Sequence, residues 1–259
     1  ISQYQFESNA ADDYNNSDVF TPYAGLIYNL NDSISIYTSY TEIFLPQDAR
    51  DANNKRLEPM TGNNIELGAK GDFFDEKLTA SVAVFKVQKE NVAKPDDGAL
   101  PLPGGSYPMH LVDGTSNQGY EVELNGKPTE NWDLFFSYTY SKSEDQDGAA
   151  FSTHLPKDLV RLSSLYHFDG ALADLTVGGN LSWQSKIYKD KAGPNGERSE
   201  QDSYYLVNLM TSYQLTDDAK VQLNINNLFD KKYYSSIDFY NQGFFGEPRK
   251  IELNLSYNF

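Results

Sequence analysis

The stretch RKIELNLSYNF, residues 249–259, decides the fold class. Every odd position from Ile251 to Phe259 is apolar, and every even position between them is polar. A period of two is typical of a β-strand, because successive side chains of a strand point to opposite faces. One face of this strand is therefore expected to contact an apolar medium, while the other contacts water or polar groups.

The same alternation recurs along the whole chain, and no amphipathic helical pattern of comparable length competes with it. Charged residues within these segments fall opposite the apolar side chains, as Glu66 does between Ile65 and Leu67. The sequence therefore predicts an all-β protein of about twelve strands. The expected strands are residues 1–7, 19–30, 33–45, 63–73, 77–89, 117–127, 132–142, 158–168, 175–188, 204–215, 220–229 and 249–259.

The connections between these segments alternate strictly in length. Short turns are expected at 31–32, 74–76, 128–131, 169–171 and 216–218, and long loops at 46–62, 90–116, 143–157, 189–203 and 230–248. A β-sandwich with Greek-key crossings would not gather all its long loops at one end. An antiparallel up-and-down transmembrane β-barrel does, with tight turns on one side of the membrane and long loops on the other.

The aromatic content supports the same architecture. Phe, Trp and Tyr make up 14% of the chain, and rings with polar tips suit the two headgroup layers of a bilayer. The mean hydropathy of -0.60 is no objection, since only alternate residues would touch lipid. We expect Phe44, Tyr188, Tyr204, Tyr233 and Tyr234 near the outer rim, and Phe73, Trp132, Phe168, Tyr213 and Tyr257 near the inner one.

Composition excludes several classes of function. The chain of 259 residues has no cysteine, which excludes a disulfide framework and thiolate metal sites. It has no apolar run long enough for a transmembrane helix. The formal charge of -16 argues against a nucleic-acid partner, because binding to phosphate backbones depends on Lys and Arg.

Catalysis has little support in the sequence. The histidines are His110 and His154, in expected loops, and His167, on the expected inward face near a short turn. No nucleophile, base and orienting acid converge by spacing, and no set of His or carboxylates has the spacing of an ordinary metal site. We therefore predict no catalytic residue, no protein-bound metal and no enzyme activity.

Three stretches resemble a known family. Residues 224–234, NINNLFDKKYY, followed by GEPR at 246–249 and a last strand ending in Phe259, resemble the C-terminal signature of TonB-dependent outer-membrane receptors. Residues 21–30, TPYAGLIYNL, with 37–47, and residues 57–62, LEPMTG, with 64–70, are similar to ferric-siderophore receptors of the hydroxamate or pyoverdine branch.

The resemblance implies a fold and a set of partners. Such receptors have a 22-stranded barrel with a plugged lumen, so residues 1–259 are expected to be the C-terminal portion of that barrel without its plug domain and TonB box. The implied function is transport of a ferric siderophore across the bacterial outer membrane, energised by TonB through the plug. Phe259 resembles the terminal aromatic that the β-barrel assembly machinery recognises; as an alternative it is one more ring facing outer-membrane lipid.

The resemblance also points to ligand-binding residues. Iron would arrive already chelated, and a chelate surface of mixed polarity calls for aromatic walls and a few hydrogen-bond donors on outer loops. Tyr240 is the first candidate, because similar pyoverdine receptors have a ligand-contacting aromatic at about this distance from the terminal Phe. The other expected ligand-binding residues are Phe239, Phe244, Phe245, Tyr107, Met109 and His110. Each could instead pack against its neighbours in the loop.

Two other functions remain open from the sequence. A self-standing barrel of about twelve strands could act as a diffusion channel, since barrels with an even strand number close. A soluble β-sandwich could bind carbohydrate.

Overall fold

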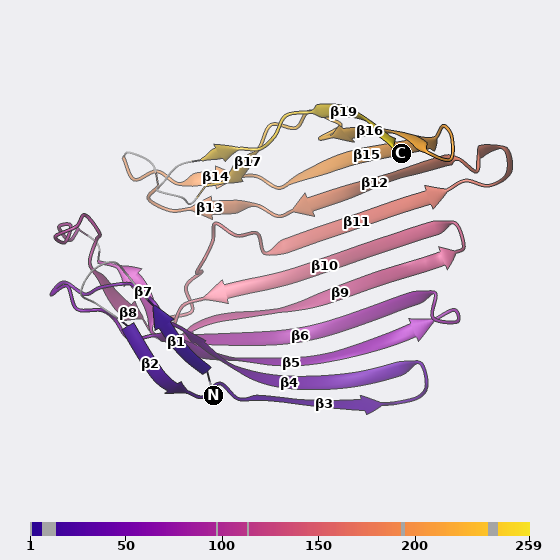
Figure 1. Ribbon diagram of the computed structural model, residues 1–259. Coiled ribbons are helices and arrows are strands. Elements are labelled where there is room, and N and C mark those ends of the chain that lie inside the picture. The colour runs from indigo at the N-terminus through magenta and orange to yellow at the C-terminus, as the bar shows by residue number, and fades with distance from the viewer. Residues whose placement is uncertain (1, 7–13, 97, 113, 193–194, 238–242) are drawn as a thin grey trace.

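The fold is built around one large antiparallel sheet (Figure 1). The computed structural model describes residues 2–6, 14–96, 98–112, 114–192, 195–237 and 243–259. Within these residues, eleven strands form one continuous curved sheet. In spatial order they are β19 (Lys250–Tyr257), β16 (Ala219–Asn226), β15 (Tyr204–Gln214), β12 (Leu175–Gln184), β11 (Asp158–His167), β10 (Trp132–Glu144), β9 (Thr115–Thr129), β6 (Leu78–Glu90), β5 (Met60–Phe73), β4 (Ile34–Leu45) and β3 (Tyr23–Asn29).

Four two-stranded sheets accompany the large one. They are β1 (Ser2–Phe6) with β2 (Tyr14–Val19), β7 (Val92–Pro95) with β8 (Met109–Val112), β13 (Ile187–Lys189) with β14 (Ser199–Gln201), and β17 (Tyr234–Ser236) with β18 (Phe244–Phe245). The last three lie inside long loops, and a short 3₁₀ helix spans Gly170–Leu172. The expectation that residues 1–7 form a twelfth strand of the main sheet is therefore wrong, because β1 pairs with β2 instead.

The register separates an apolar face from a polar face. One row across five strands joins Val122, Tyr138, Val160, Trp183 and Tyr205. The adjacent row, one residue along each strand, consists of Glu123, Ser137, Arg161, Ser182 and Leu206. Since side chains alternate across a sheet, the two rows point to opposite faces, as the period of two predicted.

In the part of the chain that the structure describes, no second layer covers the sheet. Among the residues whose burial is described, the buried apolar side chains are Ile187, Ala192 and Ile237, none of which belongs to the large sheet. Side chains of the apolar face such as Leu67 and Leu253 are instead 55% and 72% exposed. A sandwich needs a core between two sheets, so the sandwich alternative is wrong.

Short and long connections alternate as predicted, and each kind gathers at one end of the sheet (Figure 1). We call these the short-turn end and the long-loop end. The short connections are residues 30–33, 74–77, 130–131, 168–174 and 215–218. The long ones are residues 46–59, 91–114, 145–157, 185–203 and 227–249.

Two neighbouring short turns are joined by an ion pair. Phe74, Asp75 and Glu76 turn the chain with positive φ angles of 57°, 57° and 64°. Lys77 follows them, and its Nζ lies 2.6 Å from Oε1 of Glu130 in the next short turn. The hydrogen bond between these side chains lowers the pKa of Glu130 and raises the pKa of Lys77.

The two edge strands of the sheet run in the same direction. Neighbouring strands are antiparallel, and the number of strands is odd. β3 and β19 consequently both run from the long-loop end to the short-turn end. These two edges could meet each other only as a parallel pair.

Candidate functional site

Three of the predicted ligand-binding residues lie in the long loop 91–114. Met109 and His110 begin β8, and the backbone N–H of Met109 donates to the carbonyl of Arg50 over 2.7 Å, which ties this loop to the loop 46–59. Nδ1 of His110 lies 2.5 Å from Oδ1 of Asp96, so the ring already has a carboxylate partner. Tyr107 is 56% exposed. The three residues thus share one loop, in which Tyr107 and His110 are exposed and Met109 is half-buried.

Two further candidates form β18 in the last long loop. Phe245 stacks on Tyr234, with ring centroids 4.7 Å apart and an interplanar angle of 27°. Phe245 is nevertheless 76% exposed and Phe244 is 45% exposed, so both present aromatic surface to the outside. Phe239 and Tyr240, also predicted to bind ligand, lie outside the described residues.

Asn227 anchors the start of this loop. It is 5% exposed and adopts a left-handed φ of 48°. Its side chain accepts a hydrogen bond from the N–H of Lys231 and donates to the carbonyls of Lys231 and Glu247, at 2.8, 2.9 and 3.0 Å. The carboxylate of Asp230 accepts from the N–H of Arg249 over 2.9 Å. The NINNLFD stretch thus closes both ends of the loop through side-chain contacts to the backbone.

The aromatic residues expected at the two rims lie near strand ends. Tyr204, at the long-loop end, packs on Tyr233 with ring centroids 4.6 Å apart. At the short-turn end, Tyr166 meets Phe168 edge to face at 5.0 Å, and Tyr257 meets Phe259 in the same way at 5.0 Å. Phe259 is fully exposed.

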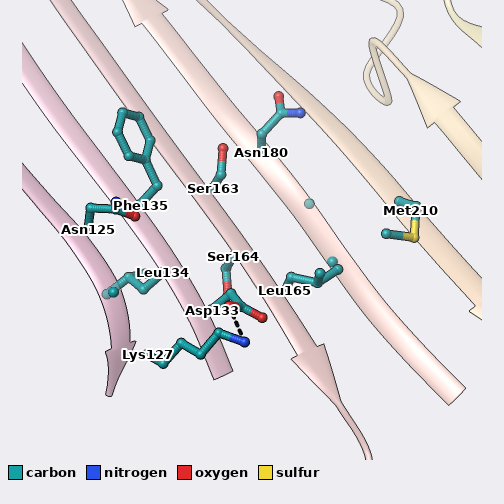
Figure 2. Close-up of a pocket in the computed structure, with 13 residues that line it drawn as sticks. Asn125, Lys127, Asp133, Leu134, Phe135, Ser163, Ser164, Leu165, Asn180 and Met210 are labelled. Atoms are coloured by element: carbon teal, nitrogen blue, oxygen red, sulfur yellow. Dashed lines mark ion pairs between the residues drawn. The ribbon is translucent and has the colours of Figure 1, made fainter. Parts of the chain in front are cut away.

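A hollow of about 520 Å³ lies on the sheet near the short-turn end (Figure 2). Phe135, Leu165 and Met210 supply apolar surface, and Ser163 and Asn180 supply polar groups. These five side chains belong to the polar face, as the register shows. The hollow is therefore an apolar patch on an otherwise polar wall.

Charged groups line the edge of this hollow. Nζ of Lys127 lies 3.1 Å from Oδ1 of Asp133, as the dashed line in Figure 2 marks. The other carboxylate oxygen of Asp133 lies 3.2 Å from Nε2 of His167, whose Nδ1 is 3.2 Å from the hydroxyl of Thr176. His167 thus lies on the polar face near a short turn, as predicted, where it links β10, β11 and β12.

A second cavity, of about 640 Å³, opens between three long loops. We call it the loop cavity. Its walls are residues 93–95 of β7, the segment 149–154, and residues 188–190 at the end of β13 and just after it. Phe151 and Tyr188 contribute aromatic surface, and Lys94 and His154 contribute polar groups.

Sequence reasoning missed the loop cavity. Its three walls come from loops separated by about 35 to 55 residues, and no local pattern indicates that they meet. The available signal was weak: Tyr188 was expected at the outer rim, and His154 in an outer loop. Metal ligation also has no geometric support, since no group of three or more His, Cys, Asp or Glu within the described residues could hold a metal ion.

Comparison with known proteins identifies a family whose sequence model matches most of this chain. Residues 2–228 match the family model described as TonB dependent receptor-like, beta-barrel. The part of the chain that the structure describes contains no helix long and apolar enough to cross a membrane.

Several curated relatives are receptors for ferric pyoverdines. The ferripyoverdine receptor of Pseudomonas aeruginosa is 39% identical over 247 residues, which cover 93% of this chain and 30% of that protein. The ferric-pyoverdine 358 receptor of Pseudomonas putida is 38% identical over 241 residues, covering 93% of this chain and 29% of that protein. The chain thus spans about 30% of the length of these relatives.

Solved structures agree with the sequence comparison. The crystal structure of the ferripyoverdine receptor of the Pseudomonas aeruginosa outer membrane, bound to ferripyoverdine, superposes with a TM-score of 0.89 at 37% identity. That likeness covers 99% of this chain and 35% of the receptor chain. The alcaligin outer-membrane receptor of Bordetella pertussis superposes with a TM-score of 0.69 at 31% identity, over 98% of this chain and 39% of that one.

Proposed function

Because the chain belongs to the family of TonB-dependent receptor-like β-barrels, we propose that it supplies part of the barrel of an outer-membrane receptor for a ferric siderophore of the pyoverdine type. The observation that carries the proposal is the 39% identity to a ferripyoverdine receptor over 93% of this chain. In this proposal the iron complex is cargo, and the protein itself holds no metal.

The two faces of the sheet suit this role. The apolar face would contact lipid, and the polar face would line the lumen, where hydrogen-bonding groups such as Ser137 and Ser182 can face water or a lumen-filling domain. In the intact receptor, a plug domain outside residues 1–259 would occupy the lumen and transmit the pull of TonB. The eleven strands would then be half of a 22-stranded barrel.

The direction of the edge strands favours this receptor over a self-standing channel. β3 and β19 are parallel, so the sheet cannot close on itself with the antiparallel pairing that outer-membrane barrels use. Antiparallel closure requires an odd number of additional strands between these two edges. A half-barrel of a larger receptor meets that requirement, whereas an isolated channel of these strands does not.

The long-loop end would capture the ligand. Phe244 and Phe245 expose aromatic surface there, and Tyr107 does the same on another loop. We propose these three, with Met109, His110, Phe239 and Tyr240, as ligand-contacting residues. His110, which is paired with Asp96, would offer a polar group to the ligand.

Two further assignments belong to the same proposal. Phe259 would be the aromatic that the β-barrel assembly machinery reads, since its ring is fully exposed at the short-turn end. The protein would have no catalytic role, as its family is one of transport receptors. The His167 contacts to Asp133 and Thr176 would then serve to hold neighbouring strands together.

Uptake of labelled iron tests the function. Cells that express the intact receptor containing this chain, and that lack other siderophore receptors, are given ⁵⁵Fe bound to each of several pyoverdines or to hydroxamate siderophores. We expect TonB-dependent uptake of one complex, and none in a matched strain without TonB. The proposal fails if no complex is taken up while the purified protein conducts ions in a planar bilayer.

A further inference from the structure

Two of the three walls of the loop cavity are fixed by backbone hydrogen bonds. The N–H of Tyr188 donates to the carbonyl of Thr153 over 2.9 Å, which joins two of the three loops. The N–H of Phe151 donates to the carbonyl of Ser143 on β10, also over 2.9 Å. Between them Ser152 adopts a left-handed φ of 53°, a conformation that a non-glycine residue rarely adopts without support from its surroundings. The walls formed by the segments 149–154 and 188–190 are therefore held in place relative to each other without a ligand.

The volume and surface of the cavity suit part of a small molecule. Its 640 Å³ lies within the range of about 300 to 1,000 Å³ found for small-molecule sites. Phe151 and Tyr188 are half-buried and offer flat apolar surface, and the remaining wall mixes small apolar residues such as Ala93 with polar and charged ones. The Arg198 guanidinium lies over the Tyr188 ring, with its carbon 4.2 Å from the ring centroid. An arm of a ligand can thus rest against a ring that is already positioned.

The charges around the cavity favour an anion. Lys94 and Lys189 line it, together with one carboxylate, Asp190. That carboxylate is engaged by Arg198, whose Nε lies 2.6 Å from its Oδ1. Lys94 is exposed and makes no ion pair with any other described residue. Lys94 therefore brings an available positive charge to the cavity, in a chain whose formal charge is -16.

We propose that the loop cavity is a subsite for an anionic arm of the ferric siderophore, with Lys94 as the pairing cation and Phe151 and Tyr188 as the wall. This inference rests on the proposed receptor function and adds a charge preference to it. Lys94 is on β7, and its backbone lies opposite His110 in the β7–β8 pair. The subsite thus adjoins the hairpin that carries two of the predicted ligand-contacting residues.

Three ligands with one iron chelate test the charge preference. Ferrioxamine B ends in an ammonium group, its N-acetyl derivative is neutral there, and its N-succinyl derivative ends in a carboxylate. Binding of each to the purified intact receptor is measured by intrinsic fluorescence for the wild type, Lys94→Gln and Lys55→Gln. The Lys55 variant is the matched control, since it removes the same charge from a long loop outside the cavity.

We expect the wild type and Lys55→Gln to bind the succinyl form about three- to tenfold more tightly than the acetyl form, the effect of one partly exposed ion pair. Lys94→Gln should lose this preference and keep its affinity for the acetyl form. Raising the salt concentration should weaken the preference in the wild type through screening.

Other outcomes overturn the subsite. Equal affinities for the acetyl and succinyl forms in the wild type would do so, as would a preference that persists in Lys94→Gln. Where none of the three forms binds, a ferric pyoverdine that carries a carboxylate arm is titrated into the same three proteins. An affinity that falls in Lys94→Gln but not in Lys55→Gln supports the subsite, and equal affinities refute it. Absence of pyoverdine binding to the wild type refutes the receptor function instead.

Discussion

Replacing Asn227 should loosen the whole last long loop. The asparagine side chain holds Lys231 and Glu247, which are near the two ends of the loop 227–249, and Asn227 itself is buried. Asn227→Ala removes all three hydrogen bonds and leaves an alanine at a φ of 48°. Asn227→Gly removes the same bonds but tolerates the backbone conformation.

The expected cost follows from these contacts. Three hydrogen bonds of about 1 kcal/mol each give about 3 kcal/mol for the glycine variant. The left-handed alanine adds about 1 kcal/mol, so the alanine variant should lose about 4 kcal/mol. The neighbour Asn226 is the control, since its side chain makes one long contact of 3.5 Å to Glu252. Asn226→Ala should cost less than about 1 kcal/mol.

Hydrogen exchange in the intact detergent-solubilised receptor measures this loss where it occurs. The amides of Gly246 and Arg249 report on the loop, because they bond to Tyr233 and Asp230 and make no bond to Asn227. A loss of about 3 kcal/mol corresponds to roughly 100-fold faster opening. We expect this acceleration in Asn227→Gly, a larger one in Asn227→Ala, and almost none in Asn226→Ala. If the Asn227 and Asn226 variants exchange alike, the anchoring role is refuted.

Three more predictions concern the two faces and the short-turn end. Leu253→Arg should cost about 2 to 4 kcal/mol of folding stability in lipid vesicles and Asn254→Arg much less, because only the first lies on the apolar face; equal costs would contradict the face assignment. The Lys77–Glu130 pair should stabilise the short turns fully between pH 4.5 and 10.5, the ordinary pKa values of Glu and Lys. As the pH falls below 4.5, this stabilisation should be lost through the lowered pKa of Glu130. As the pH rises above 10.5, it should be lost through the raised pKa of Lys77. Unfolding of the wild type and a Lys77→Met variant across pH measures it, and a difference that does not depend on pH would exclude the pair. Deleting Phe259 should reduce the amount of receptor assembled in the outer membrane without changing ligand affinity of the assembled fraction, and unchanged assembly would leave the ring a lipid contact only.

The large sheet could be predicted from the sequence because each strand has one apolar and one polar face. This alternation of side chains is visible within a single strand. The alternation around Leu253 and around Glu66 depends only on which neighbours point the same way, so it can be read without knowing the partners of the strand. The alternation of short turns and long loops could be predicted for the same reason, because it follows from where each strand begins and ends. Residues 1–7 show the limit of this reasoning, because their alternation does not reveal that β1 pairs with β2 rather than with the large sheet.

The candidate site was less predictable because it depends on contacts between loops. Phe245 was predicted as a ligand-binding aromatic of the last long loop, but its stacking on Tyr234 requires the β17–β18 pair, which no local pattern indicated. Lys94 was missed altogether, since a single lysine in a loop gains meaning only when Phe151 and Tyr188 come near it. Tyr240 and Phe239 remain predictions from the resemblance.

The shared direction of the two edge strands also constrains how such proteins can change in evolution. A second copy of this eleven-strand unit placed beside the first would meet it through β19 and β3, which run the same way. Tandem duplication of the unit therefore cannot produce a closed antiparallel barrel. Gain or loss of one hairpin keeps the alternation of directions intact, so barrels of this kind are expected to change in size by two strands at a time.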